Sequence, residues 1–497
     1  MTKKDLVEEL KPLFYPRSVA IVGASKSLVK IGTMTLMSIV VGGFEGGIYP
    51  VNRKGGRILG KKAYSDFKSL PDDADLLIVC VPAVAVPEVL QDGIDAGIGA
   101  AVIISSGFGE VGAEGKKLED EVVKIARDGG IRFVGPNCMG ICSSPVKLHA
   151  LMNMMIPKPG GVSFVSQSGT LGTVNMLVAS NHGIGFNKFV SSGNEADLRA
   201  EDLLEYFAKD EDTELCLSFI EGLREGRRFF NVSKEATTRK PFIMLKAGAT
   251  EQGAKAANSH TGSLAGSYQI NSAALRQAGV LMATTGTEML ELLKAFSLLP
   301  LPDGKRVGIV TPGGGAGVLA ADACGKVGLE VPTLSKGLID EMNEYLPPFW
   351  SHGNPVDITA SGGIGGSGGA DFSALTDSLD ILMRSGEVDS AICMGVSFSD
   401  MMDSVLDNFP DNFKNMLGPM TAAIAPIEKK FNDKLVEIKE KYGKPIVLMG
   451  VHESVPKSAL ELEKNGIILY SEPEIAAYAL SKMAWYSDYL KANNGGK

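Results

Sequence analysis

From Ser18 almost to its end, the chain alternates apolar strand-like runs with helix-like runs, and this alternation limits the folds open to it. Runs such as SVAIVGAS, DLLIVCVP and AAVIISSG each precede a segment of helical periodicity. Such alternation predicts parallel sheets with right-handed crossovers, whose ligands bind at the carboxyl ends of the strands. A chain of 497 residues is too long for one ordinary core. We therefore expect an α/β protein of about three domains.

The alternation restarts twice, which predicts the domain boundaries. Residues 1–148 read as a Rossmann-like domain, and a Pro/Gly-rich linker at 156–161 accompanies the start of a second α/β unit over 149–300. The linker LPLPDG then opens a third unit over 301–497, for which a flavodoxin-like layout fits the pattern. Within it, 361–370 (SGGIGGSGGA) is glycine-rich and reads as a mobile segment.

Composition and charge argue against several classes of partner. The net charge of −9 and pI near 5.3 supply no overall basic field for nucleic acid. The N-terminus MTKKDLVEEL lacks the apolar core of a signal peptide, and the apolar runs are too short to span a bilayer. We expect no membrane partner and a cytoplasmic location. The six cysteines are scattered, and the Cys138 and Cys142 pair has no second cluster, so we expect free thiols and no metal site.

The first domain carries a loose glycine loop and a basic turn. After Gly23 the next glycine is Gly32, which departs from the dinucleotide pattern G-x-G-x-x-G. The second strand ends in Asn52-Arg53-Lys54, where an NAD site usually has an acidic residue. Two cations favour a nucleotide with an extra ribose phosphate, either NADP or coenzyme A, and the loose loop favours coenzyme A. An ordinary solvated turn also accounts for these residues.

The second unit opens with a candidate anion site. The strand VSFVS leads into a loop at 167–172, and a helix is expected from about Thr173. Free backbone N–H groups and the positive end of the helix dipole attract phosphate at such a position. The loop lacks the Gly-Lys-Ser/Thr ending of a P-loop, so it does not predict direct ATP binding of that kind. A plain capped turn is the alternative.

A histidine stands in a polar stretch between two recognisable elements. Residues 240–248 read as a buried strand, and 266–279 read as a helix. Between them, 249–265 offers no continuous core face and reads as a loop that carries His260. An imidazole near solvent can accept a group and carry it elsewhere. A surface histidine in a polar linker is the alternative.

Glu221 follows the strand CLSFI in the same unit. If this strand is parallel to the one ending near Lys246, Glu221 and the His260 segment emerge at the same edge of the sheet. A carboxylate there can fix the imidazole tautomer and stabilise the cation that forms. A surface carboxylate remains the alternative reading of Glu221.

Several motifs together resemble a known family. SVAIVGAS, YPVN, GPNCMG, SQSGTLG, SGNEAD, SHTGSLAG, TPGGGAGVLAAD and NPVDIT occur in the order seen in NDP-forming acyl-CoA synthetases. That family includes the succinyl-CoA synthetase α subunit and ADP-forming acetyl-CoA synthetases, and the resemblance covers nearly the whole chain. It implies a Rossmann-like CoA-binding domain followed by two flavodoxin-like domains. It also implies an acid–thiol ligase that reversibly converts acyl-CoA, phosphate and NDP into carboxylate, coenzyme A and NTP.

The resemblance also implies roles for individual residues. His260 would be the phosphorylated nucleophile, and Glu221 would orient it. Phosphate would bind at Ser168, Gly169, Thr170 and Gly262. Coenzyme A would bind at Gly23, Ser25, Lys26, Asn52, Arg53, Lys54, Val81, Pro82, Ser105, Ser106 and Gly107, with Asn137 near the thioester.

No stretch of the chain resembles the ATP-grasp domains that bind the nucleotide in this family. The resemblance therefore implies a β-type partner that binds ATP/ADP or GTP/GDP with Mg²⁺, in an α2β2 assembly or with a homodimer of this chain. The substrate would be a small carboxylic acid or its acyl-CoA. A non-catalytic CoA- or acyl-CoA-binding protein and a nicotinamide-dependent oxidoreductase are the alternative functions.

Overall fold

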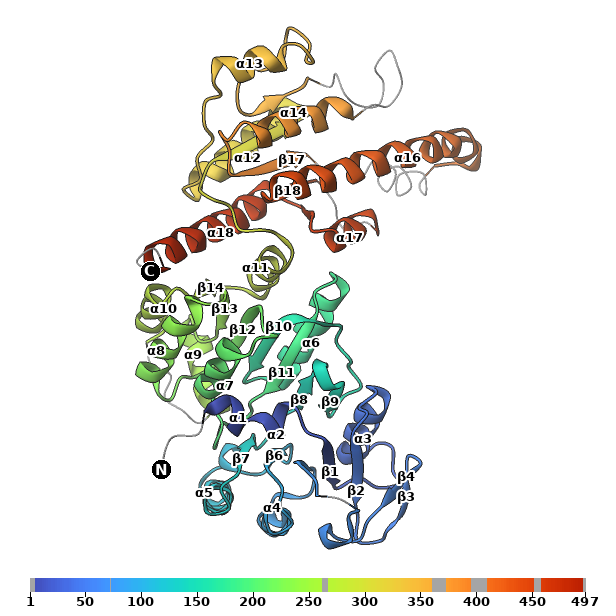
Figure 1. Ribbon diagram of the computed structural model, residues 1–497, viewed down its shortest axis with the longest axis vertical. Coiled ribbons are helices and arrows are strands. Elements are labelled where there is room, and N and C mark those ends of the chain that lie inside the picture. The colour runs from blue at the N-terminus through green and yellow to red at the C-terminus, as the bar shows by residue number, and fades with distance from the viewer. Residues whose placement is uncertain are drawn as a thin grey trace. The chain divides into compact units, whose positions relative to one another are not determined.

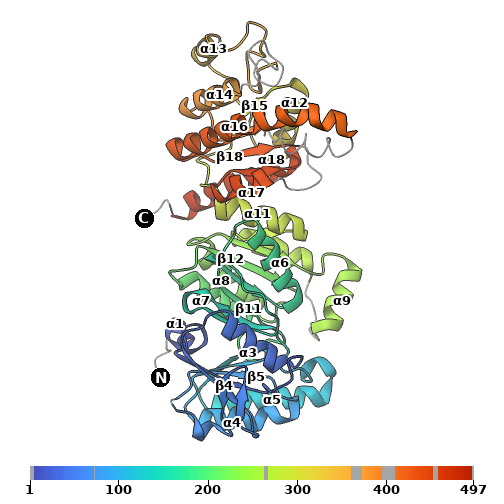
Figure 2. The same ribbon diagram turned by 90° about the vertical axis from the view of Figure 1, so that its right-hand side faces the viewer.

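The computed structural model describes residues 5–71, 73–261, 267–359, 372–394, 409–450 and 457–494. The chain forms two compact units, Met1–Leu290 and Glu291–Lys497 (Figures 1 and 2).

The first unit begins with a parallel five-stranded sheet in the order β2-β1-β5-β6-β7. Its strands are β1 (Ser18–Val22), β2 (Gly47–Val51), β5 (Leu76–Val79), β6 (Ala100–Ile103) and β7 (Arg132–Val134). Helix α3 (Ile31–Val41) covers one face, and α4 (Val86–Asp95) and α5 (Ala113–Asp128) cover the other (Figure 2). Because both faces are covered, β5 and β6 are buried at every position, as their unbroken apolar sequences predict.

The second sheet of this unit has seven strands in the order β14-β13-β12-β10-β11-β8-β9. The parallel strands are β10 (Pro159–Ser166), β11 (Phe186–Ser191), β12 (Leu215–Ile220), β13 (Phe242–Lys246) and β14 (Leu281–Ala283). The hairpin β8 (Gly140–Ser143) and β9 (Leu148–Leu151) adds an antiparallel edge through β11. Since β8 already belongs to the second sheet, the sheets change near residue 140. The domain division at 148 and 149 stays a prediction.

The second unit contains a parallel sheet in the order β16-β15-β17-β18-β19. Its strands are β15 (Val307–Thr311), β16 (Val356–Asp357), β17 (Ser390–Met394), β18 (Ile446–Met449) and β19 (Ile468–Tyr470). All three sheets share one order of parallel strands, in which the first strand lies between the second and the third. The predicted fold class, a Rossmann-like domain followed by two flavodoxin-like domains, is confirmed. The glycine-rich segment 361–370 lies outside the described residues.

The remaining elements connect or cover these sheets. In the first unit they are α1 (Leu6–Glu9), α2 (Lys11–Phe14), β3 (Gly56–Ile58), β4 (Lys61–Ala63), α6 (Gly169–Asn181), α7 (Ala200–Lys209), α8 (Gly226–Thr237), α9 (Glu251–Thr261) and α10 (Tyr268–Gln277). Helix α11 (Gly286–Leu298) crosses the boundary between the units. In the second unit they are α12 (Gly314–Lys326), α13 (Lys336–Met342), α14 (Ser373–Arg384), α16 (Asp411–Tyr442), α17 (Lys457–Lys464) and α18 (Pro473–Asn494).

All six cysteines are free, and five of them are buried, as expected. Cys80 is partly accessible, but its thiol lies in an apolar setting that raises its pKa to about 12. Burial likewise raises the pKa of Cys138 to about 12. Thiols with such pKa values stay protonated at neutral pH, so these positions fill the core and are poor nucleophiles.

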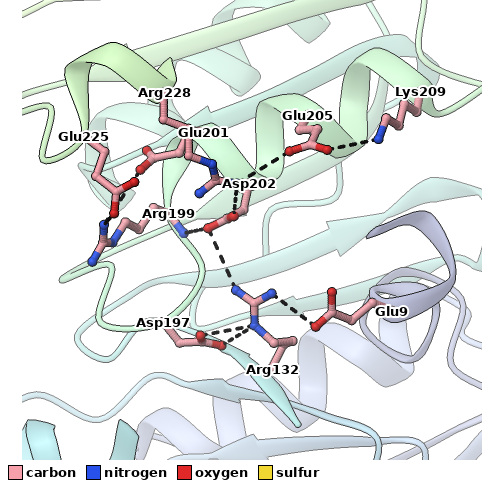
Figure 3. A network of polar contacts seen from close by, with 10 residues as sticks. All are labelled: Glu9, Arg132, Asp197, Arg199, Glu201, Asp202, Glu205, Lys209, Glu225 and Arg228. Carbon is pink, nitrogen blue, oxygen red and sulfur yellow. Dashed lines mark hydrogen bonds and ion pairs between the residues drawn. The ribbon is translucent and has the colours of Figure 1, made fainter. Parts of the chain in front are cut away.

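The first two sheets are joined by a segment that we call the bridging turn, residues 192–198. Its backbone N–H groups at Asn194, Ala196 and Leu198 donate to the carbonyls of Pro136, Gly135 and Phe133, at 2.9, 3.1 and 3.2 Å. The Asp197 carboxylate accepts from the Arg132 Nε at 2.9 Å, and Arg132 also reaches Glu9 and Asp202 (Figure 3). The bridging turn therefore fixes the end of β7 against the start of α7.

A fully buried ammonium group lies within the second sheet. Lys188 on β11 is 0% exposed, and its Nζ lies 2.8 Å from the Asp210 carboxylate and 3.1 Å from the Tyr15 hydroxyl. Burial lowers the pKa of Lys188, whereas the Asp210 carboxylate opposes that shift. The protonated form of Lys188 is thus stabilised mainly by Asp210.

We expect Asp210→Ala to destabilise the first unit by about 3–5 kcal/mol, because it leaves a buried charge without its partner. Differential scanning calorimetry should show the thermal midpoint of this unit falling by roughly 10 °C. Asp212→Ala is the matched control. Asp212 is exposed and accepts a hydrogen bond from the Tyr15 hydroxyl, so its loss should cost under about 1 kcal/mol. Equal shifts in the two variants would contradict the argument.

Candidate active site

A cavity of about 330 Å³ lies where the carboxyl ends of the first two sheets face each other. In both sheets the strand order reverses beside the first strand, and ligands of α/β proteins bind at this reversal. The lining residues come from loops that follow strands of both sheets and from the start of α6. They are Ile31, Ile104, Ser106, Asn137, Cys138, Met139, Met152, Gln167, Ser168, Gly169, Thr170, Ser191, Gly193, Asn194, Glu195, Glu221, Gly222 and Arg224.

One wall of the cavity is the N-terminus of α6. Ser168 is the N-cap, and its side chain accepts from the Leu171 N–H at 3.4 Å. The amides of Gly169 and Thr170 have no acceptor within the helix, because they belong to its first turn. A Cβ at Gly169 would lie 1.9 Å from Met139 Cγ, so this position accepts only glycine without rearrangement. Together these groups form a donor-rich end that suits an anion.

The helix begins earlier than expected. We predicted a start at about Thr173, but α6 begins at Gly169. Glycine and threonine are poor helix formers, so the sequence around Gly169 reads as a loop. The Ser168 cap and the close approach of Met139 override that preference, and they place the helix N-terminus directly in the cavity.

Glu221 lines the same cavity at the end of β12. As predicted, β12 is parallel to β13, with Ile220 opposite Lys246. Glu221 is 8% exposed, and its backbone N–H donates to the Gln167 side chain at 2.6 Å. Behind it, the buried Lys246 donates to the Glu221 carbonyl at 2.6 Å, and desolvation lowers the pKa of Lys246 to about 8. The backbone of Glu221 is therefore held from both sides.

The predicted coenzyme A residues of the first loop and the basic turn lie at one edge of the first sheet. Gly23 has φ +104°, and a Cβ there would lie 2.2 Å from the Cys80 carbonyl oxygen. The Asn52 amide donates to the Ala24 carbonyl at 2.8 Å and so ties the two loops together. Ser25, Lys26, Arg53 and Lys54 lie on these same two loops, and Arg53 forms an exposed ion pair with Glu88 at 2.9 Å.

The other predicted coenzyme A residues follow β5, β6 and β7. The Ser105 hydroxyl donates to the Val81 carbonyl at 2.6 Å, which joins the loops of Val81-Pro82 and Ser105-Ser106-Gly107. Ser106 and Asn137 reach the cavity. The structure thus brings together Ser106, Asn137, Ser168, Gly169, Thr170 and Glu221 in one cavity. Gly23, Ser25, Lys26, Asn52, Arg53, Lys54, Val81, Pro82, Ser105 and Gly107 are not among the lining residues and lie along the adjoining sheet edge.

The segment that carries His260 differs from the prediction. We expected a loop over 249–265, but α9 occupies Glu251–Thr261. Its first turn is capped by Thr250, whose Oγ1 accepts from the Gly253 N–H at 3.1 Å, and alanine, lysine and glutamate are strong helix formers. His260 belongs to this helix by its backbone, whereas its side chain and Gly262 lie outside the described residues.

Five polar residues of the cavity were not predicted: Gln167, Ser191, Asn194, Glu195 and Arg224. Asn194 and Glu195 were visible as part of the SGNEAD motif, but nothing in the sequence placed that motif opposite Gln167. Arg224 donates to the Asn194 carbonyl at 2.8 Å, so it also holds the bridging turn. These contacts join residues that are far apart in the chain.

Among the described residues, no group of three or more His, Cys, Asp and Glu side chains could hold a metal ion. Within the same ranges, no helix is both long and apolar enough to cross a membrane.

The chain matches three family models in sequence order. A CoA binding domain matches residues 17–144, a succinyl-CoA ligase like flavodoxin domain matches 159–296, and a ligase-CoA domain matches 307–376. The cavity is lined mainly by residues of the first two matched domains.

Relatives and a solved structure agree with these models. The α subunits of ADP-forming acetate–CoA ligases II and I from Pyrococcus furiosus are each 40% identical, with coverage of 95% and 97% of this chain and 97% and 98% of theirs. The acetyl-coenzyme A synthetase 1 of Ca. Korarchaeum cryptofilum, solved with phosphate and ADP, has a TM-score of 0.84 and 33% identity over 97% of this chain and 98% of that one. These relatives do not favour a nicotinamide-dependent oxidoreductase. The chain belongs to the NDP-forming acyl-CoA synthetase family of acid–thiol ligases, as an α-type subunit.

Proposed function

We propose that this chain carries the acyl and phosphoryl transfer steps of an ADP-forming acyl-CoA synthetase that acts on acetate or another small carboxylate. Phosphate attacks the acyl-CoA carbonyl, so an acyl phosphate forms and coenzyme A leaves. A nitrogen of His260 then attacks phosphorus, the carboxylate leaves, and phosphohistidine remains. A nucleoside diphosphate takes the phosphoryl group in the last step. All steps are reversible.

The cavity is the observation that carries this proposal. An anion-binding helix end (Ser168 to Thr170), the Glu221 carboxylate and the loop ends of the CoA-binding domain line one space. Acyl transfer to phosphate requires a thioester and a phosphate side by side, and this arrangement supplies a position for each. The phosphates of coenzyme A would lie on the loops of Ser25 and Asn52 to Lys54, with the thioester toward Ser106 and Asn137.

The nucleotide step is assigned to a partner. The name "subunit alpha" of the Pyrococcus relatives supports a β-type partner, and we propose that an ATP-grasp subunit binds ADP or GDP with Mg²⁺. Mg²⁺ would there neutralise charge on the transferred phosphoryl group. An α2β2 assembly and a cytoplasmic location are proposed. The net charge of −9 argues against a nucleic-acid partner.

The proposal predicts a phosphorylated intermediate. The chain, incubated with its β-type partner and γ-labelled ATP, should acquire label that is acid-labile and alkali-stable, as expected for phosphohistidine. Addition of acetate and coenzyme A should discharge that label and produce acetyl-CoA. Label that resists acid, or no label on the chain, would contradict the proposed function.

A further inference from the structure

A buried ammonium group lies next to the turn of Glu221 and Gly222, which we call the Glu221 turn. Lys246, the last residue of β13, is 4% exposed, and its Nζ donates to the carbonyls of Glu221 and Ala247 at 2.6 and 2.8 Å. Both hydrogen bonds are charge-assisted, because the donor is an ammonium group. The phosphoryl-transfer steps give this group no chemical role of its own.

The two carbonyls belong to the two strand ends that lead to the candidate catalytic residues. Strand β12 ends at Ile220, directly before Glu221, and Ile220 lies opposite Lys246 on β13. One residue further on, the Ala247 N–H donates to the Ile220 carbonyl at 2.9 Å. The Lys246 ammonium group therefore joins the two chains just beyond their last paired residues.

The chain after Ala247 leads into α9, the helix that carries His260 by its backbone. Gly248 has φ +85°, a conformation that glycine adopts without strain. Helix α9 then begins at Glu251, and Thr250 caps its first turn. The Ala247 carbonyl thus lies at the base of this helix, and the same ammonium group holds it and the Glu221 carbonyl.

A second side chain holds the remaining polar groups of the Glu221 turn. The Gln167 Oε1 accepts from the N–H groups of Glu221 and Gly222 at 2.6 and 3.0 Å, and its Nε2 donates to the Gly222 carbonyl at 2.9 Å. Gln167 follows β10 and Lys246 ends β13, and these strands are the two neighbours of β12. Gln167 therefore joins the turn to the start of α6, whereas Lys246 joins it to the base of α9.

The Lys246 ammonium group is held at a cost to the stability of the fold. Desolvation lowers its pKa to about 8, and Glu221 opposes that shift only in part. The fold thus disfavours the charged form, compared with water. An apolar side chain of similar length would avoid this cost, so stability alone is a weak reason for a lysine here.

We propose that Lys246 is a positioning residue for phosphoryl transfer: its ammonium group holds the Glu221 turn at a fixed place relative to the base of α9. This inference rests on the proposed function. The Glu221 carboxylate can orient the His260 imidazole only while the two strand ends keep their relative position. An error of about 1 Å in such a placement can lower a rate about 100-fold.

The test measures the rate at which the chain, assembled with its β-type partner, is labelled by ³²P-acetyl phosphate at pH 7. Lys246→Met keeps the length of the side chain but has no donor, so its rate should fall roughly 30- to 100-fold. Its affinity for coenzyme A should stay within about twofold of wild type. Lys246→Arg keeps a charge and N–H donors, and it should be at least about tenfold faster than Lys246→Met.

Lys240→Met is the matched control at the other end of the same strand. Lys240 precedes β13, is partly buried, and its Nζ donates to the carbonyls of Phe207, at 3.0 Å, and Asp210. Desolvation lowers the pKa of Lys240 as well. Because Lys240 does not line the cavity, Lys240→Met should be labelled within about twofold of the wild-type rate.

A double-mutant cycle with Glu221→Gln separates positioning from general damage to the fold. Lys246→Met should slow the Glu221→Gln enzyme by less than about threefold, because no carboxylate remains to be placed. Equal losses in the two backgrounds, or wild-type rates in Lys246→Met, would overturn the inference. If Lys246→Met does not assemble with its partner, Lys246→Gln takes its place in the cycle. Absence of label in wild type would instead contradict the proposed function.

Discussion

Substitution of His260 by alanine should abolish phosphorylation of the chain and reduce acetyl-CoA synthesis at least about 1000-fold. The reaction passes through a phosphohistidine in the proposed function, so loss of the imidazole removes the nucleophile that accepts the phosphoryl group. Coenzyme A binding should persist, because the loops of Gly23 and Asn52 belong to another sheet. Labelling with γ-³²P ATP in the presence of the partner, followed by isothermal titration with coenzyme A, measures both properties.

His182 supplies the control for this substitution. It is the C-cap residue of α6, at the end of the helix remote from the cavity, and it is not a lining residue. His182→Ala should retain label and turnover. If His260→Ala remained labelled, or if His182→Ala lost its label, another residue would have to carry the phosphoryl group.

Glu221→Gln should lower turnover by roughly 100- to 10,000-fold while leaving the fold intact. The backbone of Glu221 is held by Gln167 and Lys246, so an isosteric amide can occupy the same position. What is lost is the negative charge that, under the proposed function, fixes the imidazole tautomer and stabilises its cationic form. The expected result is a low kcat with coenzyme A affinity within about threefold of wild type.

Glu225→Gln is the corresponding control. Glu225 lies on the same loop, pairs with Arg199 outside the cavity, and is half exposed (Figure 3). It should change kcat by less than about twofold, since an exposed ion pair contributes little. Equal losses in Glu221→Gln and Glu225→Gln would indicate damage to the loop and would remove the catalytic role from Glu221.

The meeting of Ser168 and Glu221 could be predicted from sequence because it follows from strand direction alone. Both residues follow apolar strands of one parallel sheet, so they emerge at the same edge. The start of α6 could not be predicted. Position 169 requires glycine because a Cβ there would clash with Met139, a residue that is distant in the chain. The same holds for Gln167, whose partners Glu221 and Gly222 lie far along the chain.

The prediction for the segment that carries His260 failed for the opposite reason. The residues after Thr250 do favour a helix locally, but the absence of an apolar face led us to read them as a loop. A short helix that follows a strand can form through its N-cap and the helix propensity of its residues, without burying a complete apolar face. The roles assigned to His260 and Gly262 stay predictions, because that side chain and that residue lie outside the described residues.

The union of the first two sheets has a consequence for the choice of acyl group. The hairpin β8–β9 and the bridging turn join the sheets at two separate places, so the cavity walls belong to one body. Under the proposed function, the apolar side chains of Ile31, Ile104, Met139 and Met152 on these walls would contact the acyl group. Each methylene that packs against them would add about 0.8 kcal/mol to acyl-CoA binding. The residues that select the acyl group would thus come from both sheets.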